Sequence, residues 1–388
     1  MAFSSTDHPR DQRVVILRCE SYNDVFTTLQ KGLNLLGGLT AFAQPGETLL
    51  LKPNLLLGDK PERGSTTHPA FFEAVAKVFQ VEGLRLLYGD SPGFGTPQAT
   101  VQSSGLKEIA DALGVELADF ANGRDVTNPN GKLLKVFHLA AGLDQADGVI
   151  NLPKFKTHGL MRLTGATKNL FGCLPGVQKA GFHTRLQDEF KFAEMLVDLA
   201  EHIAPRLHVM DAVMGMEGNG PRNGTVRKVG AILISTNPYA LDYCAARMMA
   251  LDPMLVPTLA VAKRRKLFEP ESIEVLGDGV EPFIMPDFDV NRSRASTTGP
   301  QGFYMDLFKN WVTPRPVIDP EKCTQCGRCV RVCPVEPKAV NFTKGRKEPP
   351  VHAYTRCIRC YCCQEMCPEE AITIETPALG RFFDRIRL

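Results

Sequence analysis

Eight cysteines near the C-terminus constrain this 388-residue chain more than any other feature of its sequence. They form two runs of the pattern C-x-x-C-x-x-C-x-x-x-C-P, and each cysteine of the second run stands 34 positions after its counterpart in the first. This spacing is typical of bacterial domains that hold two 4Fe–4S clusters. The first run is Cys323, Cys326, Cys329 and Cys333, and the second is Cys357, Cys360, Cys363 and Cys367.

A cubane cluster needs four thiolates, and one short loop with three cysteines surrounds only one side of it. In two-cluster ferredoxins the last cysteine of each run ligates the other cluster. We therefore predict that the fourth cysteines, Cys333 and Cys367, are exchanged between the runs. The predicted ligands are Cys323, Cys326, Cys329 and Cys367 for cluster 1, and Cys357, Cys360, Cys363 and Cys333 for cluster 2.

Zinc ligation and disulfide bonds are two other interpretations of these cysteines. Structural zinc sites usually join two C-x-x-C pairs and do not need a third cysteine at i+6. Disulfides belong to oxidising compartments, and the polar N-terminus lacks the apolar core of a signal peptide. We therefore expect iron and sulfur in a cytoplasmic protein. Because oxygen damages exposed low-potential clusters, we also expect an anaerobic or microaerobic cell.

The duplication extends beyond the cysteines, because short apolar segments precede and follow both runs. Residues 317 to 376 resemble bacterial-type two-cluster ferredoxins, and this resemblance implies a protein that transfers single electrons. Four arginines lie inside or beside the cysteine runs: Arg328, Arg331, Arg356 and Arg359. We expect them to favour the reduced, more negative clusters and to raise the reduction potential; the alternative is that they are simply solvated.

The length and net charge of the chain limit the number of its domains and the kinds of partner that it can bind. The chain is long enough for about two domains, and its formal net charge of +2 argues against a nucleic-acid partner. No run of 18 apolar residues is present, so we expect no membrane span. The predicted parts are a tail (1–12), an α/β domain (13–298), a linker (299–316) and the two-cluster domain (317–388).

Short apolar runs alternate with helical stretches upstream of the cysteines. Such alternation predicts an α/β fold with a mostly parallel sheet and helices on both faces, followed by a small α+β ferredoxin-like domain. We expect strands at 14–17, 48–51, 84–88, 148–152, 207–210, 231–234 and 273–276. We expect helices at 25–36, 70–79, 101–113, 190–203 and 239–249.

Polar residues that follow these strands are candidates for a binding site, because ligands of open α/β sheets bind beyond the carboxyl ends of the strands. The loop after residue 152 is the richest of them, and its two lysines should lower the pKa of His158 and keep the ring neutral. Our catalytic candidates are His158, Lys154, Lys156 and Asp90. Our candidates for a ligand cleft are Lys168, Asn169, Asn54, Asp211 and Glu217.

Residues 164–169 have two interpretations. Their backbone N–H groups and Lys168 could hold an anion at a helix start, or the segment could be a solvated basic loop. It lacks the spacing of a P-loop, and Gly93-Phe94-Gly95 lacks the third glycine of a dinucleotide fingerprint. A built-in nicotinamide site is therefore not expected, and the sequence leaves a flavin undetermined.

Six segments together resemble the family known as domain of unknown function 362, over about residues 14 to 285. The resemblance implies an iron–sulfur protein with an uncharacterised α/β domain and leaves the reaction open. The segments are Leu51-Lys52-Pro53-Asn54-Leu55, Thr66-Thr67-His68-Pro69, Gly89-Asp90-Ser91-Pro92-Gly93, Asn151-Leu152-Pro153-Lys154-Phe155-Lys156-Thr157-His158, Lys168-Asn169-Leu170-Phe171-Gly172 and Glu217-Gly218-Asn219-Gly220-Pro221.

Three functions follow from these patterns. The first is electron transfer through two 4Fe–4S clusters to a redox partner protein or to the chain's own α/β domain. The second is a ferredoxin-fed reductase that binds a small anionic molecule through Lys154, Lys156 and Lys168. The third is a redox-sensing or assembly protein. The sequence does not define the substrate, the partner or the oligomeric state.

Overall fold

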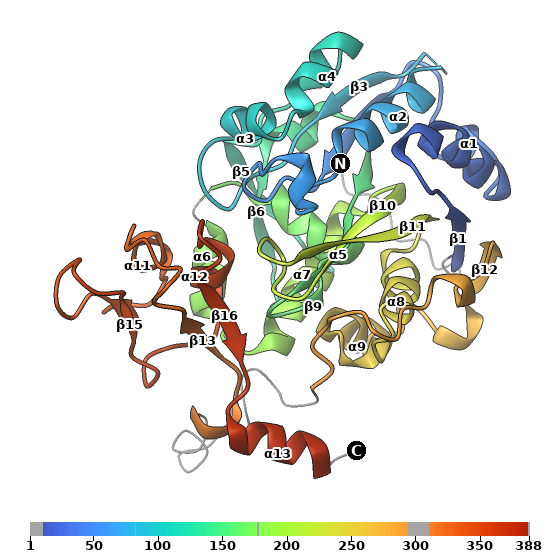
Figure 1. The fold of residues 1–388 in the computed structure, drawn as a ribbon. Coiled ribbons are helices and arrows are strands. Elements are labelled where there is room, and N and C mark those ends of the chain that lie inside the picture. Colours follow the sequence, from blue (N-terminus) through green and yellow to red (C-terminus); the bar gives the residue numbers. More distant parts are fainter. Residues whose placement is uncertain (1–10, 82, 177, 294–309, 387–388) are drawn as a thin grey trace.

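The computed structural model describes residues 11–81, 83–176, 178–293 and 310–386. Residues 11–293 contain a ten-stranded sheet, here called the α/β domain, and residues 310–386 form a smaller C-terminal domain beside it (Figure 1). The main path of the sheet is β12-β1-β11-β10-β7-β2-β3-β4, while β8 pairs with β10 and β9 pairs with β8. The strands are β1 (Arg13–Arg18), β2 (Thr48–Pro53), β3 (Arg85–Tyr88), β4 (Glu116–Leu117), β7 (Gly148–Leu152), β8 (Lys154–His158), β9 (Arg162–Leu163), β10 (Leu207–Glu217), β11 (Thr225–Ser235) and β12 (Glu274–Gly277).

The sheet is mostly parallel, as predicted. The strands β4, β3, β2, β7 and β10 run parallel to one another in that order. Strand β11 is antiparallel to both of its neighbours, β10 and β1. Only residues 218–224 separate β10 from β11, and such a short connection has no room for the crossover that a parallel pair needs.

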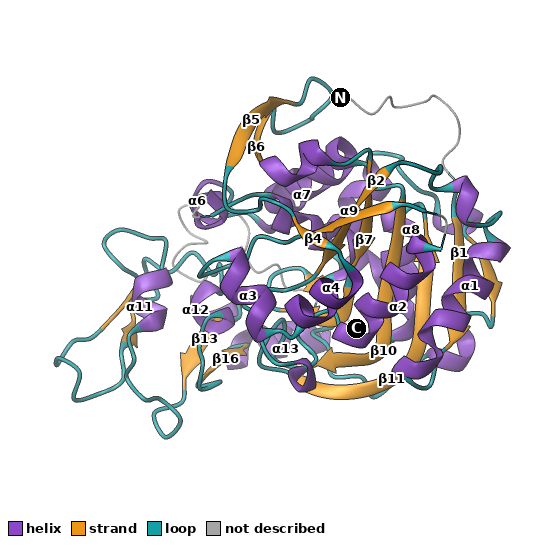
Figure 2. Cartoon of the chain, turned by 90° about the horizontal axis from the view of Figure 1, so that it is seen from above, coloured by secondary structure: helices purple, strands orange, loops and turns teal. Residues whose placement is uncertain are grey.

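Helices cover both faces of the sheet (Figure 2), because strands that are apolar on both sides must be buried on both. On one face α1, α2 and α4 enclose a core that includes Phe71, Phe72 and Phe79. On the other face α7, α8 and α9 enclose a core that includes Phe192, Leu196 and Tyr239. The helices are α1 (Val25–Leu35), α2 (Pro69–Gln80), α3 (Pro97–Ser103), α4 (Leu106–Leu113), α5 (Gly165–Asn169), α6 (Gln178–Arg185), α7 (Glu189–Ile203), α8 (Pro238–Met248) and α9 (Pro257–Arg264).

The predicted single helix over 101–113 is wrong, because the chain forms α3 and α4 with a break between them. Gly105 lies at the break with φ of +77°, in the left-handed region that interrupts a right-handed helix. Short 3₁₀ helices occupy several connections. They are Tyr22–Asp24, Leu39–Ala41, Pro61–Arg63, Ala141–Gln145, Leu170–Cys173, Pro253–Leu255, Pro270–Ser272 and Glu281–Phe283.

Two segments that were predicted as loops are strands. Residues after Pro153 form β8, whose five side chains are all buried. Strand β10 does not end at Met210 but continues through Asp211 to Glu217, where it pairs with the long β11. Both misassignments concern charged residues in strands, which only tertiary burial explains. A separate two-stranded ribbon, β5 (Gly123–Thr127) with β6 (Val136–Ala140), projects from the domain.

The C-terminal domain has the duplicated pattern that the sequence predicts. Strand β13 (Arg315–Ile318) pairs antiparallel with β16 (Ile372–Glu375), and β14 (Val340–Asn341) pairs with β15 (Val351–His352). A short helix follows the first cysteines of each run, α11 (Arg328–Val332) and α12 (Cys362–Glu365), and α13 (Ala378–Ile386) ends the domain. Most of the predicted tail (1–12) and linker (299–316) lies outside the described residues, and β13 already begins at Arg315.

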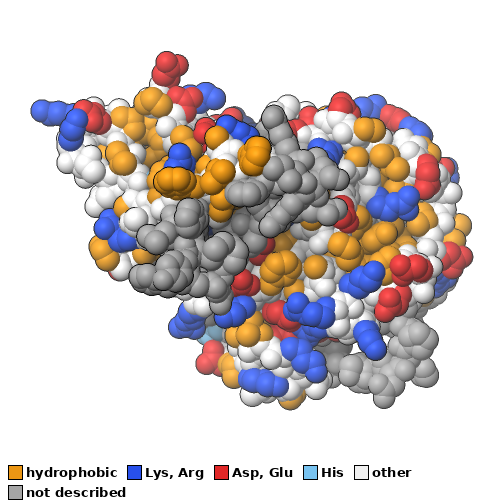
Figure 3. All heavy atoms as spheres, turned by 90° about the horizontal axis from the view of Figure 1, so that it is seen from below, with side chains coloured by type: hydrophobic (Ala, Val, Ile, Leu, Met, Phe, Trp, Pro, Cys, Tyr) orange, Lys and Arg blue, Asp and Glu red, His pale blue; other side chains and the backbone are white. Residues whose placement is uncertain are grey.

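The surface carries charges of both signs. On the face shown in Figure 3, Lys and Arg side chains are interspersed with Asp and Glu, in keeping with the formal net charge of +2. Among the described helices, none combines the length and the apolar character that a membrane crossing requires.

Candidate functional site

Two small cavities in the C-terminal domain are lined by cysteines. One is lined by Cys323, Cys326, Cys329 and Cys367. The other is lined by Cys333, Cys357, Cys360 and Cys363. Each cavity thus has four thiols from one of the two predicted ligand sets, and apolar residues such as Ile318 and Val340 complete the walls. Four thiols around an apolar hollow are the donor set that a 4Fe–4S cluster uses.

The two cysteine loops share an unusual backbone conformation. Gln325 and Gly327 in the first loop have positive φ angles of 58° and 72°. Arg359 and Tyr361, which stand 34 positions later, have φ angles of 61° and 60°. A non-glycine residue in this region costs about 1–2 kcal/mol, and such strain gathers at functional sites. The duplication therefore preserves the shape of the loop as well as its cysteines.

Helix α12 of the C-terminal domain packs against the α/β domain. Gln364 Nε2 donates to the backbone oxygen of Asn219 at 2.9 Å and to its side-chain oxygen at 2.8 Å. Asn219 Nδ2 in turn donates to the carbonyl of Ile372 at 3.0 Å. Asn223 Nδ2 donates to the carbonyls of Gln364 and Cys367 at 3.1 and 3.2 Å. Residues 219–223 connect β10 to β11, so the cysteine-bearing helix is held at one end of the central sheet.

A buried ion pair reinforces this contact. Arg222 Nη2 and Nε lie 2.6 and 2.9 Å from the carboxylate of Asp59, and Arg222 Nη1 donates to the carbonyl of Cys367 at 3.3 Å. Burial by itself would raise the pKa of Asp59, but the Arg222 hydrogen bonds outweigh it, and the pKa is lowered. Asp59 also accepts from Ser65 Oγ at 2.9 Å. The pair thus fixes a cysteine loop to the loop after β2.

Strand β8 brings three of the predicted catalytic residues together. Lys154, Lys156 and His158 alternate along β8 and are all buried, so they share one face of the strand. Lys154 Nζ lies 2.7 Å from Asp211 Oδ2 and 3.1 Å from the Tyr22 hydroxyl. Burial lowers the pKa of Lys154 although Asp211 opposes the effect.

Lys156 has amide and carbonyl partners. Its Nζ donates to Asn54 Oδ1 at 2.8 Å and to the carbonyl of Ser65. Asn54 Nδ2 donates to Asn169 Oδ1 at 2.8 Å, so both predicted asparagines belong to this network. Burial, with a further contribution from the charge of Lys168, lowers the pKa of Lys156 to about 7. Lys156 can therefore exchange a proton near neutral pH.

His158 lies at the junction of the two domains. Its Nδ1 accepts the N–H groups of Leu160 and Met161 at 3.1 and 3.2 Å, which places the ring proton on Nε2. Nε2 lies 3.2 Å from Glu365 Oε1 of α12. The pKa of His158 is lowered to about 4, as predicted in direction. The largest cause is burial and the next is Lys168, rather than the lysines of β8.

Asp90 and Lys168 flank the same region. Asp90 pairs with Lys52, with 2.8 Å between Nζ and Oδ1, and its other oxygen accepts the N–H of Leu55 at 2.8 Å. Burial lowers the pKa of Lys168, and the charges of Glu365 and Asp90 oppose this shift. Within the described residues Lys168 has no ion pair or hydrogen bond, and its Nζ lies 5.7 Å from the ring of Phe171.

At residues 164–169 the predicted binding of an anion by backbone N–H groups is wrong, and so is the solvated basic loop, whereas the predicted role of Lys168 stays a prediction. The N–H groups of Ala166 and Thr167 already bind the buried carboxylate of Asp242, at 2.6 and 3.0 Å. Burial raises the pKa of Asp242 to about 6. Gly165 has φ of +58°, and a Cβ there would lie 2.3 Å from Asp242 Oδ1, so this contact requires glycine. An internal carboxylate thus occupies the place that we predicted for a ligand.

Glu217, one of the residues predicted for the ligand cleft, does not lie with the other predicted residues. Glu217, at the end of β10, forms an ion pair with Arg227 at 3.0 Å and accepts the N–H of Asp289 at 3.0 Å. Sequence reasoning in turn missed several residues that meet at the junction. They are Tyr22, Lys52, Asp59, Arg222, Gln364 and Glu365. Lys52 lies within one of the six segments that we had selected and Arg222 directly follows another, whereas no local pattern distinguishes Tyr22 or Gln364.

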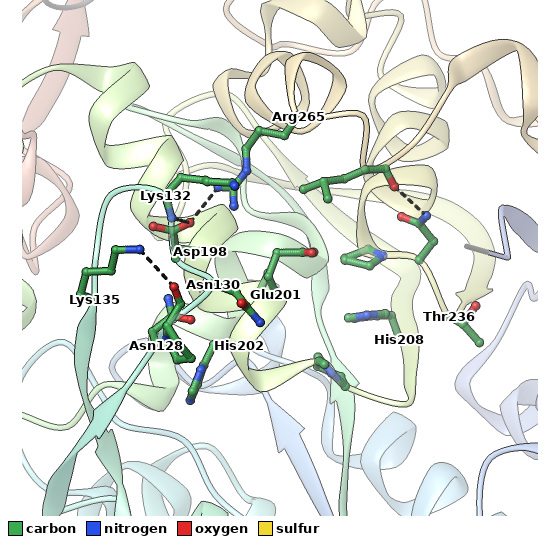
Figure 4. Close-up of a pocket in the computed structure, with 18 of the residues that line it drawn as sticks. Asn128, Asn130, Lys132, Lys135, Asp198, Glu201, His202, His208, Thr236 and Arg265 are labelled. Carbon is green, nitrogen blue, oxygen red and sulfur yellow. Dashed lines mark hydrogen bonds and ion pairs between the residues drawn. The ribbon is translucent and has the colours of Figure 1, made fainter. Parts of the chain in front are cut away.

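A wider cavity of about 850 Å³ lies at the opposite end of β10, near its first residues (Figure 4). Figure 4 shows Lys132, Asp198 and Arg265 pointing toward one another. Asp198 accepts the N–H groups of residues 132–134 at 2.7–2.9 Å and pairs with Arg265 at 2.9 Å. These contacts hold the β5–β6 ribbon, and none of the predicted site residues lines this cavity. The predicted site residues that the structure brings together lie at the domain junction instead.

Comparisons with known proteins agree with this division. Residues 49–247 match the family "Domain of unknown function (DUF362)", and residues 315–368 match the 4Fe-4S dicluster domain. The chain is 39% identical over 254 residues to "Thylakoid-associated protein sll1697" of Synechocystis sp., covering 65% of this chain and 78% of the relative.

Among solved structures, the lactate racemase apoprotein from Thermoanaerobacterium thermosaccharolyticum aligns with 12% identity and a TM-score of 0.37. That alignment spans 61% of this chain and 57% of the racemase chain. The chain therefore belongs to the DUF362 family and carries a C-terminal 4Fe-4S dicluster domain.

Proposed function

We propose that this protein transfers electrons through two 4Fe–4S clusters to its own α/β domain. The observation that carries the proposal is the docking of α12, which contains Cys363 of one ligand set and is followed by Cys367 of the other, on one end of the central sheet. Cys323, Cys326, Cys329 and Cys367 would hold cluster 1, and Cys333, Cys357, Cys360 and Cys363 would hold cluster 2. Such clusters supply one-electron chemistry at low potential.

The contact between the domains supports an internal acceptor. Glu365 stands two residues from both Cys363 and Cys367, and its carboxylate lies 3.2 Å from His158. Arg222 and Asn223 bind the carbonyl of Cys367 itself. The cysteine loops therefore adjoin the lysine-rich end of β8 through buried hydrogen bonds, whereas a freely diffusing ferredoxin domain has no need of such contacts.

The proposal is tested by reducing the anaerobically purified protein stepwise and recording electron paramagnetic resonance spectra. We expect two reducible clusters, of which Cys326→Ser alters one and Cys360→Ser alters the other. A variant that changes both signals equally would contradict the ligand assignment. Spectra without a reducible iron–sulfur signal would overturn the electron-transfer function.

A group of buried and half-buried lysines without carboxylate partners favours a second candidate, a reductase for a small anionic molecule. Asp90, Asp211 and Asp59 each pair with a cation at 2.6–2.8 Å. Lys156, Lys168 and Lys179 have no such carboxylate partner among the described residues, and burial lowers the pKa of each. An anion beside them would relieve the unfavourable burial of positive charge.

Thermal shift of the loaded protein tests this candidate with a panel of small carboxylates and phosphates. We expect one class to raise the melting temperature, and Lys168→Met to abolish the increase. Lys107→Met is the control, because Lys107 is exposed and pairs with Asp111 on α4. If no anion stabilises the protein, or if both variants respond alike, the reductase proposal fails.

Location and partners are also proposals. The Synechocystis relative is named for thylakoid association, so we propose that this protein works at a membrane surface on the cytoplasmic side, supplied by a redox partner protein. Fractionation of cells that express the tagged chain tests this. Recovery of all the protein in the supernatant at low salt would contradict association with a membrane.

A further inference from the structure

The side chains of β8 form a row that runs from the protein surface to the domain junction. Lys154, Lys156 and His158 lie on one face, at a Cα spacing of roughly 6.6 Å for alternate residues of a strand. The intervening side chains point the other way: Phe155 packs against Phe288, and Thr157 Oγ1 binds the carbonyl of Gly218. A strand that places three titratable side chains in one buried line needs a reason beyond packing.

The outer end of the row reaches the surface at Tyr22 and His68. The two rings are stacked with their centroids 3.8 Å apart, and both residues are half-buried. The Tyr22 hydroxyl accepts a hydrogen bond from Lys154 at 3.1 Å and lies 3.3 Å from Asp211 Oδ1. The half-buried Tyr22 is thus the residue through which Lys154 lies nearest to the surface in this row.

A buried hydroxyl group that lacks a partner lies one residue from a partner of Lys156. Thr66 Oγ1 is buried and has no hydrogen bond among the described residues. Thr66 follows Ser65, whose carbonyl accepts from Lys156 Nζ. An unsatisfied buried hydroxyl at this point suits a bound water molecule. A water there would lie close in sequence to the Ser65 carbonyl that binds Lys156 Nζ.

The inner end of the row is oriented by the backbone. Because His158 Nδ1 accepts from Leu160 and Met161, its Nε2 carries the proton and faces Glu365 of α12. The row therefore ends at Glu365, which stands between the predicted cluster ligands Cys363 and Cys367.

We propose that β8 is a proton-supply route, in which protons enter at Tyr22, pass Lys154, and are held at Lys156 when the C-terminal domain is reduced. This inference rests on the proposed electron-transfer function. One electron from an external low-potential donor enters the domain, and one proton from solvent converts the Lys156 amine to an ammonium. The added charge is thereby balanced inside the protein.

The charged groups around Lys156 explain the direction of the coupling. After burial, the largest influences on its pKa are Lys168 of α5, which lowers it, and Asp59 and Glu365, which raise it; Lys154 on the same strand also lowers it. Negative charge on the Glu365 side thus favours the ammonium. An electron added on that side acts in the same sense, so reduction raises the proton affinity of Lys156.

The test is the midpoint potential of the loaded full-length protein between pH 6 and pH 9, measured by voltammetry. We expect the potential to fall with pH above about pH 7, with a limiting slope of about 59 mV for each tenfold change in proton concentration. Lys156→Met and Lys156→Arg should both give flat profiles, since neither side chain titrates in this range. Lys107→Met should keep the slope of the native protein.

A flat profile in the native protein, or an unchanged slope in both Lys156 variants, would overturn the proton route while leaving electron transfer intact. Failure of the proposed function is different, because the clusters would then not be reduced at all. The Tyr22→Phe variant tests proton entry at Tyr22 separately from proton uptake at Lys156. We expect the same equilibrium potentials but a slower approach to them at high scan rate, and an unchanged rate would exclude Tyr22 as the entrance.

Discussion

Arg359 is the largest side chain that the described residues bury almost completely, with 1% of its surface exposed. Its Nη2 donates to Asn310 Oδ1 at 2.6 Å, and its guanidinium lies 5.1 Å from the ring centre of Tyr354. It stands between Cys357 and Cys360 and binds the carbonyl of Cys357 at 3.4 Å. Of the two predictions made for this arginine, simple solvation is therefore wrong, because the charge is buried beside two predicted cluster ligands.

Replacing Arg359 by Gln should lower a midpoint potential on the order of 50 mV, close to a tenfold change in the reduction equilibrium. A buried cation acts through a lower dielectric constant than an exposed one, and it stabilises the more negative reduced state. Arg328→Gln is the matched control. Its guanidinium lies 5.7 Å from the ring of Phe94, at a half-buried position. Voltammetry should show the smaller change there; equal changes would refute the role of burial.

At the scale of elements, the docking of α12 depends on a few polar contacts from the loop between β10 and β11. The Arg222–Asp59 pair is buried, with side chains 10% and 6% exposed. A second ion pair at the same junction, between Arg63 and Glu370, is far more exposed, at 35% and 46%. Comparing the two ion pairs therefore tests the effect of burial within one interface.

Arg222→Met should destabilise the protein by about 3–5 kcal/mol, because it leaves the buried Asp59 carboxylate without its cation. Arg63→Met should cost no more than about 1 kcal/mol. Urea unfolding of the loaded protein measures both. Limited proteolysis should also release the C-terminal domain faster in the Arg222 variant. Similar losses in the two variants would mean that the buried pair does not hold the junction.

The strands of the sheet show which parts of the fold the sequence predicts and which it does not. Apolar runs predict most strands of the sheet because a strand buried on both faces needs little else. They do not predict β8, whose alternating Lys-Phe-Lys-Thr-His pattern after Pro153 suggests a polar loop. Its burial depends on Asp211, Asn54 and Glu365, which come from three distant parts of the chain. The sequence thus identifies the site residues by their type and position, but it does not show which of them contact one another.

At the scale of the whole molecule, the α/β domain holds three buried, uncharged histidines. Burial lowers the pKa of His158 and His183 to about 4 and that of His208 to about 3. Each folded pKa lies below the unfolded value of about 6.5. Below pH 6.5 the unfolded chain therefore binds more protons, so the stability is complete above that pH and is lost as the pH falls.

Lowering the pH from 7 to 5 should cost roughly 2 kcal/mol for each histidine, or roughly 6 kcal/mol for the three. Urea midpoints measured across this range test the estimate. His208→Asn should reduce the loss by about a third, because it removes one of the three histidines; among the described residues the hydrogen-bond partner of His208 Nδ1 is the amide of Asn151, at 2.9 Å. Stability that does not change between pH 7 and pH 5 would contradict the burial of neutral histidines.

The arrangement of the two domains was beyond the reach of sequence patterns. The cysteine spacing predicts two ligand sets, and the two cysteine-lined cavities have the same membership. Nothing in that spacing indicates that α12 would face the lysines of β8, because Gln364, Arg222 and Asp59 are ordinary polar residues until the fold brings them together.

The most direct measurement is the iron and acid-labile sulfide content of protein purified without air. We expect about eight irons and about eight sulfides per chain, with a brown colour that reduction bleaches. A colourless protein, or one that contains zinc in place of iron, would contradict it.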